Sequence, residues 1–140
     1  MNASQPLVSV VTPFYNPAPY FAQCIESVLA QTYTNFEYVL LDNHSTDGSA
    51  DLAREYARRD ARVKVVRNET FLTMTQNHNA VLRLMSPESR YCKVLQADDW
   101  LFPSCIAEMV RVAEAQPSIG VVSAYTLLER SVLHWHVRPA

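Results

Sequence analysis

The chain has 140 residues, of which 49% are hydrophobic, and a formal net charge of -2 at pH 7. This composition supplies one compact core and gives no reason to expect a second domain, so we treat residues 1–140 as a single domain. The scattered Lys and Arg form no basic stripe of the kind that follows a phosphate backbone, which argues against a nucleic-acid partner.

Targeting signals and metal-binding cysteine motifs are absent from the sequence pattern. Residues 1–9 lack the basic start and apolar core of a secretory signal, and no apolar run approaches the roughly 20 residues that cross a bilayer. We therefore expect a soluble, cytoplasmic domain. Three widely spaced cysteines, Cys24, Cys92 and Cys105, predict buried reduced thiols. The chain has only two glycines, so a P-loop or GxGxxG phosphate cradle is excluded.

Strands and helices are predicted to alternate along the chain. Residues 7–12 form a β-branched run that is apolar on both faces apart from Ser9, which is typical of a central strand, and Pro13 is expected to end it. Apolar residues then recur at helical spacing in four segments, one of which opens with a capping box from Thr73 to Gln76. The expected strands are 7–12, 36–41, 63–66, 91–95 and 119–125, and the expected helices end near 31, near 60, before 87 and before 117.

This alternation predicts right-handed βαβ units and therefore a doubly wound α/β domain, with a mostly parallel sheet and helices on both faces. In such a sheet the loops that follow the strands meet at the carboxyl edge, where ligands bind. Tyr15, Asn43 and the pair Asp98–Asp99 all follow strands. We expect these side chains to converge on one site.

The adjacent carboxylates of Asp98 and Asp99 follow an apolar run that is predicted to be a buried strand. Neighbouring carboxylates that are partly enclosed repel each other, which favours a raised pKa or a bound hard divalent cation. The alternative is a solvated turn whose carboxylates cap the helix that starts near Pro103. The expected convergence of three loops favours a site.

Four sequence blocks occur in order: VSVVTPFYN at 8–16, SVLAQTY at 27–33, LDNHSTDGS at 41–49 and QADDW at 96–100. With these blocks the chain resembles family 2 glycosyltransferases of the GT-A fold, over about residues 7–125. The resemblance implies a Rossmann-like fold and transfer of a sugar from a UDP- or dTDP-sugar to an acceptor hydroxyl with inversion. It also implies a Mn²⁺ or Mg²⁺ ion between the protein and the diphosphate.

The resemblance further implies roles for individual residues. Pro13 and Tyr15 match the loop that packs on the nucleobase, Asn43 stands where many members carry a base-binding aspartate, and Asn77 matches the Asn of an Arg-Asn pair. Asp98 matches a carboxylate near the ribose, and Asp99 matches the metal ligand. Two departures are that Gln96 replaces an acid and that the Arg before Asn77 is missing, for which Arg67 or Lys93 could compensate.

In this family the acceptor-binding half follows the fifth strand and supplies the general base. Glu129 is the only acid after Glu114, so the resemblance implies the donor-binding half of a longer enzyme, as a truncated form or an incomplete gene product, with the base absent. The acceptor would be a saccharide, a lipid-linked molecule or a protein. The resemblance is compatible with a role in polysaccharide or cell-wall synthesis at the inner face of the membrane. It is also compatible with a homo-oligomer. A non-catalytic nucleotide-binding or interaction module is the alternative.

Five further residues suggest chemistry but have simpler explanations. His44 is expected to be a solvated loop residue, Asp47 a helix cap, and Trp100 a packing residue under the acidic loop. His134 and His136 have HxH spacing, but no third ligand is evident, so a solvated or interface strand is favoured over a metal site.

Overall fold

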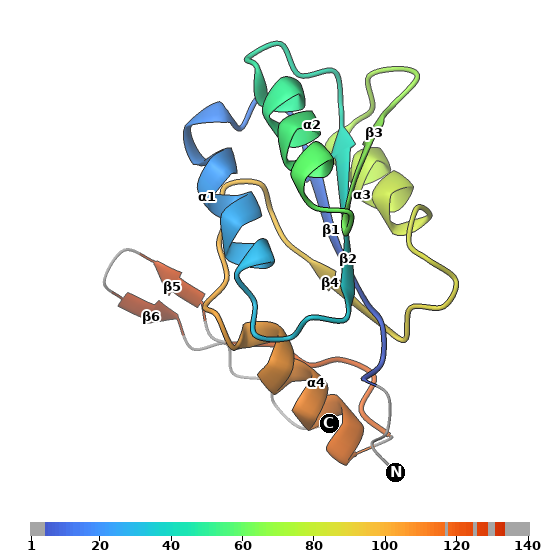
Figure 1. The fold of residues 1–140 in the computed structure, drawn as a ribbon, viewed down its shortest axis with the longest axis vertical. Coiled ribbons are helices and arrows are strands. Elements are labelled where there is room, and N and C mark those ends of the chain that lie inside the picture. The colour runs from blue at the N-terminus through green and yellow to red at the C-terminus, as the bar shows by residue number, and fades with distance from the viewer. Residues whose placement is uncertain (1–4, 117, 125, 129–130, 134–140) are drawn as a thin grey trace.

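The computed structural model describes residues 5–116, 118–124, 126–128 and 131–133 (Figure 1). A four-stranded parallel sheet in the order β3-β2-β1-β4 forms its centre. The strands of this sheet are β1 (Val8–Phe14), β2 (Phe36–Asp42), β3 (Val63–Arg67) and β4 (Tyr91–Val94). The helices are α1 (Ala18–Leu29), α2 (Ser49–Arg59), α3 (Met74–Leu82) and α4 (Cys105–Ala115).

Helices cover both faces of the sheet, as the sequence predicted. Figure 1 shows α1 and α2 on one side and α3 on the other. On the first side the buried side chains of Val10, Tyr38 and Leu40 pack in one cluster with α1, α2 and α4. On the second side, alternate residues of β1 and β2 pack against Val81 of α3. The doubly wound, mostly parallel α/β fold is therefore confirmed.

Strand β1 continues through Pro13, so the expected end of this strand was wrong. The amide of Leu95 donates to the carbonyl of Val11 at 3.0 Å, so the backbone N–H and C=O groups of Val11 point toward β4. Because backbone groups alternate along a strand, the backbone nitrogen of Pro13 points toward β4 as well. The ladder between β1 and β4 ends at the pair Val11–Val94. Because no donor is needed beyond that pair, proline is tolerated inside the strand.

Strand β4 is less buried than its apolar composition predicted. Cys92 and Val94 are exposed, because α3 covers β1 and β2 on that face and, among the described residues, nothing covers β4 there. The prediction of three buried thiols is therefore wrong for Cys92, whereas Cys24 is buried and Cys105 half-buried, and all three thiols are free.

The expected fifth strand, 119–125, is not formed over its described residues 119–124. Residues Ile119 to Val122 instead line a cavity of about 310 Å³ against β4 and α4. Two short antiparallel strands, β5 (Thr126–Leu128) and β6 (Ser131–Leu133), form a separate sheet. Among the described residues no helix is both long and apolar enough to cross a membrane.

Local signals at the helix ends are largely confirmed. Thr73 and Gln76 form the predicted capping box of α3. The N-cap of α2 is Gly48, whose φ of 90° lies in the left-handed region that glycine adopts without strain. Helix α1 ends at Leu29, slightly before the expected position near Gln31.

Candidate functional site

A cleft of about 560 Å³ lies at the carboxyl edge of the sheet. It is lined by the loops after β1, β2 and β4 and by the segment that leads into α3. The five residues predicted to bind a nucleotide sugar all line this cleft: Pro13, Tyr15, Asn43, Asn77 and Asp98. The convergence expected from the topology is therefore present.

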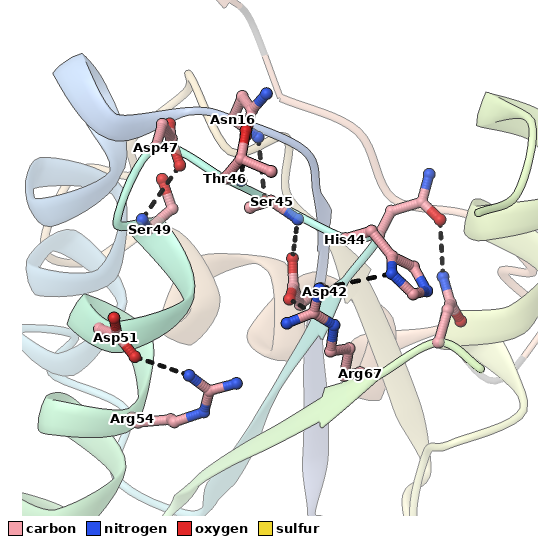
Figure 2. A network of polar contacts seen from close by, with 12 residues as sticks. Asn16, Asp42, His44, Ser45, Thr46, Asp47, Ser49, Asp51, Arg54 and Arg67 are labelled. Carbon is pink, nitrogen blue, oxygen red and sulfur yellow. Dashed lines mark hydrogen bonds and ion pairs between the residues drawn. The ribbon is translucent and has the colours of Figure 1, made fainter. Parts of the chain in front are cut away.

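The loops after β1 and β2 are joined by hydrogen bonds between them (Figure 2). The amide of Asn16 donates to the hydroxyl of Ser45 at 3.0 Å, and the amide of Thr46 donates to the Asn16 side chain at 2.7 Å. Asn16 has a φ of 50°, a left-handed conformation that asparagine tolerates better than most residues. The wall of the cleft that carries Tyr15 is thus fixed against the wall that follows β2.

Asp47 belongs to the same network and has a wider role than the predicted helix cap. Its carboxylate accepts from the amide of Ser49 at 3.0 Å and from the amide of Ala18 at 2.8 Å. Burial alone would raise the pKa of Asp47, but the bonds from Ser49 and Ala18 outweigh it, so the pKa lies below its ordinary value. Asp47 therefore holds the first residues of both α1 and α2.

Asn43 is buried, with 3% of its surface exposed, and its amide is largely used inside the protein. Its Oδ1 accepts from the amide of Leu72 at 2.9 Å and from Nδ2 of Asn68 at 3.0 Å. Its Nδ2 donates to the carbonyl of Leu72 at 2.8 Å. Both acceptor positions are filled, so one N–H remains for a ligand.

A second asparagine continues this network into the cleft. Asn68 donates both to Asn43 and, at 2.8 Å, to Oδ1 of the buried Asn77. Asn68 was missed from the sequence, although it is the first residue after β3 and so stands at the same edge as the predicted residues. The topological argument that selected Asn43 applies equally to it.

Two aromatic rings stand at the cleft. Tyr15 is 52% exposed and Phe71 is 60% exposed, and their ring centroids lie 5.1 Å apart in an edge-to-face arrangement. Phe71 was also missed, because it lies in a loop that no strand or helix pattern marks. Large exposed rings lining a concave site offer a surface on which a planar group can stack.

Neither of the cations proposed to replace the missing Arg lines the cleft. Nε of Arg67 lies 3.6 Å from the buried carboxylate of Asp42, and its Nη2 lies 3.4 Å from Nδ1 of His44 (Figure 2). Lys93 lines the other cavity, beside α4. His44 is half-buried rather than solvated, so that expectation was wrong. Among the described residues, no Lys or Arg lines the cleft.

His78 and Gln96 form a polar pair in the lining of the cleft. Nδ1 of His78 lies 2.8 Å from the carbonyl of Met74, which makes this nitrogen the donor. In the neutral ring Nε2 is then an acceptor, and Nε2 of Gln96 lies 3.0 Å from it. Gln96 is the residue that replaces the acid expected from the family resemblance.

The acidic pair lies at the rim of the cleft. Asp98 and Asp99 are exposed, and the amide of Asp99 donates to the carbonyl of Gln96 at 3.1 Å, which forms a turn. Partial burial, and then the charge of Asp98, raise the pKa of Asp99 above its ordinary value, although Lys93 opposes this shift. Asp99 itself is not among the residues that line the cleft.

The donor set at the acidic pair suits a hard divalent ion, but it is incomplete. Within the described part of the chain, no group of three or more His, Cys, Asp and Glu is placed to hold a metal. Mg²⁺ and Mn²⁺ are bound by oxygen atoms and keep water or phosphate ligands when the protein supplies few. Asp98 and Asp99 therefore fit such an ion if a ligand completes its shell.

One other predicted residue is placed differently from its expectation, and three are not described. Trp100 is 48% exposed and contacts Phe102 edge-on at 4.8 Å, so it does not pack beneath the acidic loop as expected. Glu129, His134 and His136 lie outside the described residues.

A parallel sheet with helices on both faces, and a polar and aromatic cleft at its carboxyl edge, define a Rossmann-like α/β domain, the class to which GT-A glycosyltransferases belong. The family described as "Glycosyl transferase family 2" matches residues 9–139. The chain belongs to this family.

Solved structures agree with this fold. The mannosyltransferase PcManGT from Pyrobaculum calidifontis, in complex with GDP-Man and Mn²⁺, aligns with a TM-score of 0.73 and 25% identity, over 84% of this chain and 35% of its own. TarS 1-349 of S. aureus, in complex with UDP, aligns with a TM-score of 0.68 and 22% identity, over 77% of this chain and 32% of its own.

Relatives in sequence are longer proteins. The uncharacterized protein y4gI of Sinorhizobium fredii is 39% identical over 84% of this chain and 13% of its own length. The putative teichuronic acid biosynthesis glycosyltransferase TuaG of Bacillus subtilis is 36% identical over 71% of this chain and 38% of its own. This chain thus spans well under half of each.

Proposed function

We propose that residues 1–140 form a nucleotide-sugar-binding domain of a glycosyltransferase. The protein would transfer a sugar from a UDP- or dTDP-sugar to an acceptor hydroxyl, with inversion and with the help of Mn²⁺ or Mg²⁺. The observation that carries the proposal is the gathering of Tyr15, Asn43, Asn77 and Asp98 in one cleft, beside Asp99. The acceptor would be a saccharide, a lipid-linked molecule or a protein, and the family relation to TuaG favours a role in cell-wall polysaccharide synthesis.

The base of the donor would lie against the aromatic end of the cleft. Tyr15 offers an exposed ring for stacking, and Phe71 meets it edge-on. Asn43 has one free N–H, which suits a carbonyl oxygen of uracil or thymine. Its acceptor positions are filled by Leu72 and Asn68, so it would not accept the ring N–H of the base, as an aspartate could.

The diphosphate would need a cation that this chain does not supply from its described residues. Its negative charge would approach Asp98 and Asp99 in a cleft that no described Lys or Arg lines, which is unfavourable by simple Coulomb repulsion. Asp98 and Asp99 would hold a divalent ion at the rim. When bound, that ion would act as a Lewis acid that stabilises the departing diphosphate.

The remaining groups of the cleft would orient the donor. Asn77 is fixed by Asn68 and keeps its Nδ2 for the ligand, while the loops that carry Tyr15 and Asn43 are held together by their hydrogen bonds. Orientation by groups that are already in place lowers the entropic cost of reaching a reactive geometry. The residues described here therefore support donor binding, and deprotonation of the acceptor is assigned to none of them.

The test is a thermal unfolding experiment with UDP in the presence and absence of Mn²⁺ or Mg²⁺. We expect stabilisation by UDP only with metal, by about 2.7 kcal/mol when UDP is at 100 times its Kd. Asp99→Asn should remove the metal-dependent part while leaving cooperative unfolding intact. Asp51→Asn is the matched control, because its side chain is 87% exposed and lies on α2.

Two results would count against the proposal. An equal stabilisation by UDP without metal would show that the ion and the diphosphate do not share a coordination shell. If neither UDP, dTDP nor their sugars stabilised the chain with either metal, the proposal that it binds a nucleotide-sugar donor would be wrong.

A further inference from the structure

A line of polar residues along α1 meets the loop that carries the acidic pair. Cys24, Ser27 and Gln31 are spaced by three and four residues, which places them on one side of the helix and its immediate continuation. Ser27 and Gln31 belong to the sequence block 27–33, to which the proposed function gives no role. Neither residue lines the cleft.

Each of these side chains holds a backbone group in the segment from Gln96 to the first turn of α4. The thiol of Cys24 donates to the carbonyl of Gln96 at 3.4 Å, and the hydroxyl of Ser27 accepts from the amide of Leu101 at 3.1 Å. The side chain of Gln31 makes two such bonds: Nε2 donates to the carbonyl of Phe102 at 2.7 Å, and Oε1 accepts from the amide of Ile106 at 3.0 Å.

The orientation of Ser27 and Gln31 is itself fixed by the helix. Ser27 donates its hydroxyl proton to the carbonyl of Cys24 at 2.7 Å, so its oxygen is free to accept from Leu101. Gln31 is 5% exposed and also donates to the carbonyl of Ser27 at 3.0 Å. With both ends of its amide satisfied, the side chain has one hydrogen-bonded orientation.

Asp98 and Asp99 lie between the first two of these anchors. The loop is fixed at Gln96 on one side and at Leu101 on the other, and the carbonyl of Gln96 also accepts from the amide of Asp99. The acidic residues belong to no strand or helix, and the residues on either side of them, Ala97 and Leu101, are buried in the core cluster that includes α1. Their place at the rim of the cleft therefore depends on α1.

We propose that Ser27 and Gln31 are positioning residues for the Asp98–Asp99 pair, which set the carboxylates where a divalent ion and a diphosphate meet. This rests on the proposed donor-binding function. Groups that orient metal ligands without touching the metal contribute substantially to affinity, and their loss costs about 10- to 100-fold in metal binding. If Ser27 and Gln31 served only to join α1 to α4, replacing them would lower the stability of the fold but would not change the response to metal.

The test compares UDP affinity with and without Mn²⁺ by titration calorimetry in Ser27→Ala and Gln31→Met. We expect the affinity for UDP with Mn²⁺ to fall by about 10-fold, as for other residues that support metal ligands. The residual binding without Mn²⁺, which is too weak to stabilise the parent chain, should be the same in the variants. Ser27→Thr keeps the hydroxyl and should bind like the parent chain. Gln23→Met is the control for Gln31→Met, because Gln23 is exposed on the same helix.

Hydrogen exchange supplies a second measurement that needs no ligand. Ser27→Ala should lose protection at the amide of Leu101, and Gln31→Met at the amide of Ile106, while the amides of β1 and β2 keep theirs. Unchanged protection of both amides, that of Leu101 in the loop and that of Ile106 in α4, would overturn the proposal.

The binding outcomes separate this inference from the proposed function. If the parent chain does not bind UDP with Mn²⁺, the proposed function fails and the inference fails with it. If the parent chain binds and the variants bind equally well, or lose affinity equally with and without Mn²⁺, the inference alone is wrong.

Discussion

Replacing Asn43 with alanine should destabilise the domain by an amount that follows from its contacts. The change removes three hydrogen bonds, two with the backbone of Leu72 and one with Asn68, at a position that is 3% exposed. At about 1 kcal/mol for each net hydrogen bond, the free energy of unfolding should fall by about 2–3 kcal/mol. Leu72 and Asn68 are half-buried, so water can replace part of the loss, which favours the lower end.

Urea unfolding monitored by circular dichroism measures this change as a lower midpoint with an unchanged slope. Asn79→Ala is the matched control, because Asn79 is exposed on α3 and its removal should change stability by no more than about 0.5 kcal/mol. A loss in Asn43→Ala no larger than that of the control would refute the reasoning. It would mean that the Leu72 segment holds its place without Asn43.

Further predictions concern an acid, a ring and two thiols. Burial opposes the ionisation of Glu37, but bonds from Lys64 and from neighbouring hydroxyl and amide groups outweigh it, so its pKa lies below the ordinary value. Glu37→Gln should therefore cost about 1–3 kcal/mol at neutral pH, and this cost should shrink as the pH falls through the lowered pKa of Glu37. A cost that is the same at pH 3 and pH 7 would contradict this account. Under the proposed function, Tyr15→Ala should weaken UDP binding by about 10-fold, a loss typical of one base stacked on an aromatic ring, with little change in thermal stability, and calorimetry would detect it. Finally, Cys92 should react with a thiol reagent in the native chain, whereas Cys24, which is buried and has a pKa raised to about 11, should react only on unfolding; mass spectrometry of the labelled peptides distinguishes them.

Features that depend on residues close together in the sequence could be predicted from it. The capping box at Thr73 and the parallel alternation of strands and helices are local patterns, and both were confirmed. The continuation of β1 through Pro13 was not predictable, because it depends on where the partner strand β4 ends. The segment 119–125 has residues that suit a strand, but a strand forms only where it can pair with the edge strand of a sheet. Residue composition does not predict that pairing.

The residues of the candidate site also fall into two groups, those that local sequence patterns predict and those that only tertiary packing brings to the cleft. Tyr15, Asn43 and Asp98 could be found because each follows a strand and stands in a recognisable block. Phe71 and the hydrogen bonds between Asn43 and Leu72 could not be predicted, since both depend on how the segment before α3 folds over the cleft. The position of a loop relative to its neighbours is a tertiary property, and no period of hydrophobic residues encodes it.

The carboxylate of Asp47 has an electrostatic consequence for where a phosphate can bind. It receives the first amides of both α1 and α2, so one negative charge of the protein sits at two positive helix ends. In many nucleotide-binding folds such a helix end attracts the phosphate directly, through its macrodipole and free amides. Here one carboxylate of the protein already occupies the first amide of each of the two helices. Under the proposed function, a diphosphate would therefore gain less from these two helix ends, and a divalent ion at Asp98 and Asp99 would have to balance its charge.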